Sequence, residues 1–208
     1  MRDTCVSIAH CVMVRIWIYC THIYCVKLLT PSKQLYMPYS SKLLDSEVLN
    51  ILKEIKPSKV YDIGAGAGKY GLMIRKNTIE VERLICIEID KDYIEKFKLN
   101  NIYDEVLQMS AMDLISEKFY DTNFDTVVIG DCIEHLKKSD GIDLLNFLVY
   151  RTKWILVQYP IKYLQNTFEG KHQEAHISIW DDKDFDSFEI KKKLEAETQR
   201  FILIKGYL

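Results

Sequence analysis

The 208 residues, with 48% hydrophobic and 28% charged residues, are enough for one globular domain with a sizeable core but leave little room for two. This composition also disfavours disorder. Lys and Arg number 28 and Asp and Glu number 30, so the net charge of −2 gives no overall electrostatic reason to expect nucleic-acid binding.

The first 36 residues differ from the rest of the chain. Four of the six cysteines lie there, at Cys5, Cys11, Cys20 and Cys25, without the short Cys-x-x-Cys pairs of structural zinc sites. Residues 6–29 are mostly apolar and long enough to span a bilayer, but Arg15 is a costly charge at their centre. We expect residues 1–36 to be an atypical appendage of a cytoplasmic domain over residues 37–208, with a membrane anchor as the alternative.

Predicted helices and strands alternate from Ser40 onward. Serines are expected to cap the first helix and Pro57 to end it. The predicted helices cover residues 40–56, 69–76, 90–99 and 139–150, and the strands cover residues 59–63, 84–89, 105–109, 124–129 and 154–159. This alternation predicts a parallel sheet with helices on both faces. Residues 188–194 and 200–206 leave no room for a crossover helix between them, so they are expected to form an antiparallel hairpin.

A glycine-rich turn follows the first predicted strand, in the sequence VYDIGAGAG at residues 60–68. Such a turn lets a ligand approach the backbone at the start of the next helix. A P-loop is disfavoured, because three residues separate the outer glycines and Tyr70 replaces the required Ser or Thr. A dinucleotide site is an alternative, because residues 66–71 match G-x-G-x-x-G and Glu88 lies about one β-α-β step further on.

The turn resembles the first motif of the class I S-adenosylmethionine-dependent methyltransferases, an acidic residue followed by G-x-G-x-G. Asp62 is the acidic residue, and Glu88 matches the acid that ends the family's second strand. Residues 124–136, FDTVVIGDCIEHL, are similar to the fourth motif, whereas Ser110 replaces the acid of the third. The resemblance covers about residues 40–208. It implies an α/β, Rossmann-like three-layer sandwich around a mostly parallel seven-stranded sheet with an antiparallel C-terminal hairpin.

The resemblance also implies that S-adenosylmethionine is the cofactor. The glycine turn would pack against its methionyl part, and Asp62 would help to hold the amino end, directly or through water. The Glu88 carboxylate would accept hydrogen bonds from both ribose hydroxyls. The residues expected to bind the cofactor are Asp62, Gly64, Ala65, Gly66, Gly68, Glu88, Ile89, Ala111, Met112 and Asp131.

A divalent metal site is suggested by Asp131, Glu134 and His135, which would share one helical face at i, i+3, i+4 spacing, together with His176 in a later polar loop. This set resembles small-RNA 2′-O-methyltransferases and ubiquinone-pathway O-methyltransferases, in which a cation lowers the pKa of the acceptor hydroxyl. The alternative is that Glu134 and His135 merely cap a helix or line the substrate pocket. Without a metal, His135 or His176 could still act as the general base. The expected catalytic residues are Asp131, His135 and His176.

We therefore expect methyl transfer to an oxygen or nitrogen of a small-molecule acceptor. The alternatives are an NAD(P)-binding Rossmann oxidoreductase and a non-catalytic S-adenosylmethionine-binding regulatory protein. RNA 2′-O-methylation is disfavoured by the acidic balance of residues 37–208 and by the lack of an RNA-binding module. Tyr159, Tyr163, Phe168 and Trp180 are expected either to flank the substrate mouth or to pack its lid.

Overall fold

The computed structural model describes residues 40–167 and 170–208, all within the compact unit Leu35–Leu208. The predicted appendage over residues 1–36, including the alternative anchor over residues 6–29, lies outside the described residues, as does the predicted domain start at residue 37. Within the described ranges, no helix has the length and apolar character needed to cross a membrane.

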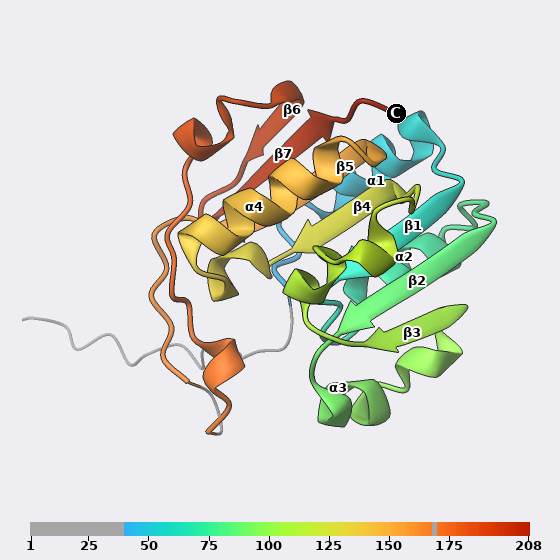
Figure 1. The fold of residues 1–208 in the computed structure, drawn as a ribbon, viewed down its shortest axis with the longest axis horizontal. Helices are drawn as coiled ribbons and strands as arrows, with labels where there is room; N and C mark the ends of the chain where they lie inside the picture. The colour runs from blue at the N-terminus through green and yellow to red at the C-terminus, as the bar shows by residue number, and fades with distance from the viewer. Residues whose placement is uncertain (1–39, 168–169) are drawn as a thin grey trace, which may run out of the picture. The chain divides into compact units, whose positions relative to one another are not determined.

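A seven-stranded sheet forms the centre of the domain (Figure 1). Its strands are β1 (Lys59–Ile63), β2 (Arg83–Glu88), β3 (Glu105–Gln108), β4 (Asp125–Gly130), β5 (Thr152–Pro160), β6 (Glu189–Glu195) and β7 (Gln199–Lys205). They lie in the order β3-β2-β1-β4-β5-β7-β6. The first five strands pair in parallel, whereas β7 runs antiparallel to both β5 and β6. The predicted fold class is therefore confirmed, including the antiparallel C-terminal hairpin.

Helices cover both faces of the sheet and make it the middle of three layers. They are α1 (Asp45–Ile55), α2 (Lys69–Lys76), α3 (Lys91–Lys96) and α4 (Lys138–Val149). In Figure 1, α4 lies in front of the sheet and α1 and α2 lie behind it. Neighbouring side chains of a strand point to opposite faces, so Val127 packs in the cluster that contains α4 and Val128 in the cluster that contains α1. Both are buried, as expected for a parallel strand covered on both sides.

The first helix begins later than the sequence predicts. α1 starts at Asp45, its N-cap is Leu44, and no side chain caps it, so the expected serine cap is wrong. The physical reason is long-range: the Ser40 hydroxyl donates to the Gly130 carbonyl at 3.4 Å and the Ser41 amide donates to the Asp131 carboxylate at 3.1 Å. These bonds tie the chain before α1 to the end of β4.

The third helix is shorter than predicted. Asp90 caps α3 by accepting a hydrogen bond from the Asp92 amide at 2.8 Å, and the helix ends at Lys96. A separate 3₁₀ turn over Leu99–Asn101 completes the predicted helical stretch. The capped start of α3 lies directly after β2, so it borders the carboxyl edge of the sheet.

Candidate functional site

A cavity lies at the carboxyl ends of β1, β2 and β4, the edge where open α/β sheets bind their ligands. It encloses about 920 Å³, including its open mouth. Its wall consists of the turns after these strands, the segment after β3, the start of α3 and part of the β5–β6 connection. The lining residues are Ser40, Gly64, Ala65, Gly66, Ile87, Glu88, Ile89, Tyr93, Met109, Ser110, Ala111, Gly130, Asp131, Cys132, His135, Leu136, Gln173 and Glu174.

The glycine turn after β1 needs its glycines for two different reasons. Gly64, Gly66 and Gly68 all have positive φ, at 68°, 52° and 76°. A Cβ atom at Gly64 would also lie 2.3 Å from the Cys132 sulfur, so the turn packs directly against the turn after β4. Gly64 and Gly66 line the cavity as predicted, whereas Gly68 lies outside its wall and starts α2 as the N-cap.

Glu88 lies in the cavity wall with its carboxylate already oriented. One oxygen accepts a hydrogen bond from the Gly66 amide and the other from the Asp90 amide, both at 2.8 Å. Burial raises the pKa of Glu88 despite these two bonds. The carboxylate therefore joins the glycine turn to the start of α3 and borders the space where a ligand would lie.

The wall next to Glu88 is mostly apolar. Ile89 and Ala111 line the cavity as predicted, and Ile89 is 53% exposed. Met112 is not among the described residues that line it. Ser110, the residue that replaces the expected acid, caps a 3₁₀ turn by accepting from the Met112 amide at 3.2 Å, and this turn takes Met112 out of the wall.

Asp62 is placed behind the cavity rather than in its wall, so the expected direct contact with a cofactor is not supported by the geometry. Its carboxylate accepts a hydrogen bond from the Tyr103 hydroxyl at 2.5 Å, and the Gly71 amide donates to that hydroxyl at 3.3 Å. Burial is the main cause that raises the pKa of Asp62 to about 7. Asp62 therefore links β1, α2 and Tyr103 beneath the glycine turn.

The raised pKa of Asp62 predicts a pH-dependent contribution to stability. The folded carboxyl holds its proton up to about pH 7, whereas the unfolded one loses it near its ordinary value of 3.8. Its contribution is therefore full below about pH 4 and is lost as the pH rises through 7. Between pH 5.5 and 8, the wild type should lose roughly 2 kcal/mol more unfolding free energy than Asp62→Asn, which keeps an acceptor for Tyr103. Urea unfolding at both pH values measures this difference, and equal losses in the two proteins would contradict the assignment.

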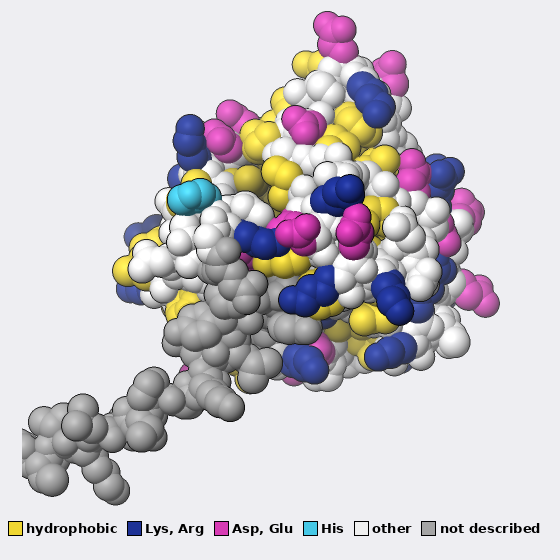
Figure 2. All heavy atoms as spheres, turned by 90° about the horizontal axis from the view of Figure 1, so that it is seen from below, with side chains coloured by type: hydrophobic (Ala, Val, Ile, Leu, Met, Phe, Trp, Pro, Cys, Tyr) yellow, Lys and Arg dark blue, Asp and Glu magenta, His cyan; other side chains and the backbone are white. Residues whose placement is uncertain are grey.

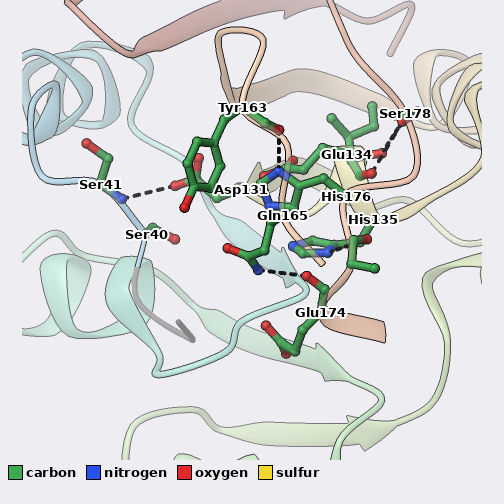
Figure 3. A network of polar contacts seen from close by, with 12 residues as sticks. Ser40, Ser41, Asp131, Glu134, His135, Tyr163, Gln165, Glu174, His176 and Ser178 are labelled. Atoms are coloured by element: carbon green, nitrogen blue, oxygen red, sulfur yellow. Dashed lines mark hydrogen bonds and ion pairs between the residues drawn. The ribbon is translucent and has the colours of Figure 1, made fainter. Parts of the chain in front are cut away.

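Asp131 belongs to a buried polar network at the cavity mouth (Figure 3). Its carboxylate accepts hydrogen bonds from the Ser41 amide and the Gln158 side chain, both at 3.1 Å. Lys69 donates to the Ser41 carbonyl, which fixes the same segment from the side of α2. Burial raises the pKa of Asp131 to about 6. Asp131 thus lines the cavity as predicted and also holds Ser40 in its wall.

Glu134, His135 and His176 come together beside the cavity, as the sequence predicts (Figure 3). One potential ligand atom from each lies within 4.8 Å of the others, and Glu134 Oε1 is 3.9 Å from His176 Nε2. Asp131 does not join this cluster. It has a φ of 49°, and only a 3₁₀ turn over Ile133–His135 follows, so the predicted helical face does not form. We call Glu134, His135 and His176 the carboxylate–histidine cluster.

The cluster directs the lone pairs of nitrogen and oxygen atoms toward its centre. His135 Nδ1 lies 3.2 Å from the Ala175 carbonyl oxygen and His176 Nδ1 lies 2.9 Å from the Tyr163 carbonyl oxygen. These contacts assign the proton to Nδ1 in both rings and leave Nε2 as an acceptor. Both Glu134 carboxylate oxygens and His176 Nε2 are buried without a hydrogen-bond partner among the described residues.

This arrangement fits a divalent cation. A carboxylate and two imidazoles are common ligands of zinc, manganese and iron, and ligating histidines ordinarily donate their other ring N–H to a backbone carbonyl or carboxylate. Burial, together with the neighbouring His176, lowers the pKa of His135 to about 4, which keeps the ring neutral as metal ligation requires.

Several site residues have no motif in the sequence. Tyr93, Gln173 and Glu174 line the cavity, although only the polar character of residues 169–176 indicated a site nearby. Two aromatic residues predicted near the mouth belong to the core: Tyr159 is buried against Phe185, and the Trp180 indole donates to the Ile133 carbonyl. Tyr163 is near the cluster through its carbonyl, and Phe168 lies outside the described residues.

Comparisons with known proteins agree with this fold. Residues 61–145 match the family described as "Methyltransferase domain". The matched stretch runs from β1 into α4 of the Rossmann-like fold described above. No curated protein sequence matches the chain.

Solved structures with the same fold share little sequence with the chain. An S-adenosylmethionine-dependent methyltransferase from Clostridium acetobutylicum superposes with a TM-score of 0.58 at 11% identity, covering 81% of this chain and 93% of that one. The methyltransferase domain of bacterial CtHen1-C gives a TM-score of 0.57 at 16% identity, with coverages of 80% and 98%. The N-terminal domain of EvdMO1, solved with S-adenosylhomocysteine (SAH) bound, gives 0.55 at 11% identity, with coverages of 80% and 82%.

Proposed function

We propose that the protein transfers a methyl group from S-adenosylmethionine to an oxygen or nitrogen of a small-molecule acceptor. The observation that carries this proposal is the pairing of the Gly64–Gly66 turn with the Glu88 carboxylate at the cavity wall. A carboxylate in this place suits a vicinal diol such as ribose, because it offers two acceptor oxygens. The relative crystallised with SAH supports the choice of cofactor.

The chain's own residues would act by binding and positioning. Glu88 would hold the ribose, Ile89 and Ala111 would pack against the adenine, and the glycine turn would leave the backbone open to the methionyl part. With S-adenosylmethionine bound, the acceptor atom would attack the methyl carbon, the carbon–sulfur bond would break with its electron pair going to sulfur, and the acceptor would release its proton to solvent water. Such a displacement needs alignment and exclusion of water rather than a covalent nucleophile.

We further propose that the carboxylate–histidine cluster binds a divalent cation beside the acceptor. When bound, such a cation supplies Lewis-acid chemistry that lowers the pKa of an acceptor hydroxyl. The lowered pKa of His135 favours this role over general-base catalysis, because an imidazole with a pKa of about 4 takes up a proton poorly near pH 7. His135 also lines the cavity, so the cluster adjoins the space for the acceptor.

The charge of the cavity supports a small acceptor without phosphate groups. Among the described residues that line it, three are acidic, Glu88, Asp131 and Glu174, and none is Lys or Arg. On the face seen in Figure 2, Lys and Arg are interspersed with Asp and Glu instead of forming a continuous basic patch. Binding of a nucleic-acid backbone ordinarily relies on cationic side chains. The cavity wall therefore favours a neutral or cationic acceptor.

A methyl-transfer screen tests this function. The protein is incubated with methyl-labelled S-adenosylmethionine and separated metabolite and RNA fractions of a cell extract, with Mn²⁺ present. Label is expected in the small-molecule fraction. Label in RNA would contradict the proposed acceptor class, and cofactor binding without label in any fraction would favour a non-catalytic binding protein.

A further inference from the structure

The β5–β6 connection is tied to the start of α3 by Lys171. The Lys171 ammonium lies 2.5 Å from the Asp90 carboxylate and 3.2 Å from that of Asp92. It also lies 4.2 Å from the centre of the Tyr93 ring, a lining residue of the cavity. Gln173 adds a hydrogen bond to the same Asp90 oxygen at 3.0 Å. These charge-assisted bonds close the connection onto the side of the cavity formed by α3.

The Lys171 attachment is well shielded from water. The Lys171 side chain is 19% exposed and that of Asp90 only 6%. The ion pair is therefore screened less than an exposed pair, and its loss should move the segment that it holds. Asp90 also caps α3 and donates its amide to Glu88, so the attachment point is itself fixed.

The residues that follow Lys171 contribute first to the cavity wall and then to the carboxylate–histidine cluster. The Glu174 side chain lines the cavity, and its carbonyl accepts a hydrogen bond from the Gln165 amide group at 2.7 Å. The Ala175 carbonyl faces His135 Nδ1. His176 then belongs to the cluster, and its backbone amide donates to the Gln165 carbonyl at 2.9 Å.

We propose that Lys171 is a positioning residue for both sites and that residues 171–176 form their common wall. This inference rests on the proposed function. The Lys171–Asp90 contact holds Glu174 at the space for the cofactor. Through the same short segment, it also fixes the position of His176 and of the Ala175 carbonyl that accepts from His135. Cofactor and cation therefore require the same placement of this wall, so each should bind more tightly when the other is present, by the same factor.

Calorimetry with SAH and with Mn²⁺ tests the inference on the full chain. Lys171→Met removes the charge but keeps an unbranched side chain over Tyr93, and Lys171→Arg restores a cation. Lys191→Met is the matched control, because Lys191 pairs with Glu189 on the edge strand β6 at 2.5 Å, outside the cavity wall. Thermal unfolding of each variant shows whether the fold is intact.

The Met variant is expected to bind SAH roughly 5- to 30-fold more weakly and Mn²⁺ several-fold more weakly, with both affinities recovered in the Arg variant and unchanged in the control. A merely structural role would lower the melting temperature without this pattern of loss and recovery. Unchanged affinity of the Met variant for either probe would overturn the common wall. Wild-type protein that fails to bind SAH would overturn the proposed function itself, which is a distinguishable result.

Discussion

Replacing His176 with alanine is expected to lower Mn²⁺ affinity by at least about 100-fold, because even the groups that support metal ligands are worth 10- to 100-fold. The side chain supplies one of three potential ligand atoms, and its Nε2 is buried beside Glu134 without a partner among the described residues. Methyl transfer should fall in parallel, since a cation held by the cluster would lower the pKa of the acceptor hydroxyl.

The matched control for His176→Ala is His172→Ala. His172 lies four residues earlier in the same connection, at the start of the 3₁₀ turn His172–Glu174, and its side chain is exposed and outside the cluster. Manganese titration followed by electron paramagnetic resonance measures both variants. Equal Mn²⁺ affinity in the two variants would show that the cluster does not bind the cation.

The second large effect is expected at Gly64. An alanine there must adopt a φ of 68°, which costs about 1–2 kcal/mol, and must place its Cβ 2.3 Å from the Cys132 sulfur and 2.8 Å from the Cys132 Cβ. Overpacking of this kind adds about 1–3 kcal/mol. We expect Gly64→Ala to lose about 2–5 kcal/mol of unfolding free energy in total. It should also lose cofactor binding, because the turn can relax only by moving the cavity wall.

The Gly170→Ala variant separates the cost of the backbone conformation from the cost of the contact with Cys132. Gly170 has a φ of 77°, but a Cβ atom there meets none of the described residues within 4 Å, so only the backbone cost of about 1–2 kcal/mol remains. Urea unfolding compares the two variants with the wild type. If both variants lose the same free energy, the contact with Cys132 has no energetic role and the turn is looser than its geometry indicates.

Elements with strong local signals could be predicted closely from the sequence. The bounds of β1 and α2 coincide with the predicted ones, because an apolar strand, a run of glycines and a helical stretch follow one another within 18 residues. The start of α1 could not be predicted from the sequence. Ser40 and Ser41 form hydrogen bonds with Gly130 and Asp131, which lie 90 positions further along the chain. Caps that compete with such distant partners have no local signal.

The residues of the candidate site also divide into those with a local signal in the sequence and those without one. Glu88 and the turn at Gly64 and Gly66 lie in the cavity wall, because Glu88 ends one strand and the turn follows another, and both strand ends are visible in the sequence. Asp62 is expected to hold the amino end of the cofactor, directly or through water, but it lies behind the cavity and accepts a hydrogen bond from Tyr103, 41 positions away, which no local signal indicates. Glu134, His135 and His176 were brought together correctly by their motif. Lys171 belongs to no motif, and its importance follows only from its contact with Asp90 across the fold.

The central claim is that this cavity binds S-adenosylmethionine, and calorimetry with two cofactors tests it most directly. Purified protein is titrated with S-adenosylmethionine and, separately, with NAD. We expect binding of S-adenosylmethionine and none of NAD, because Glu88 and the glycine turn line the cavity and residues 61–145 match the methyltransferase-domain family. Binding of NAD without binding of S-adenosylmethionine would contradict the account.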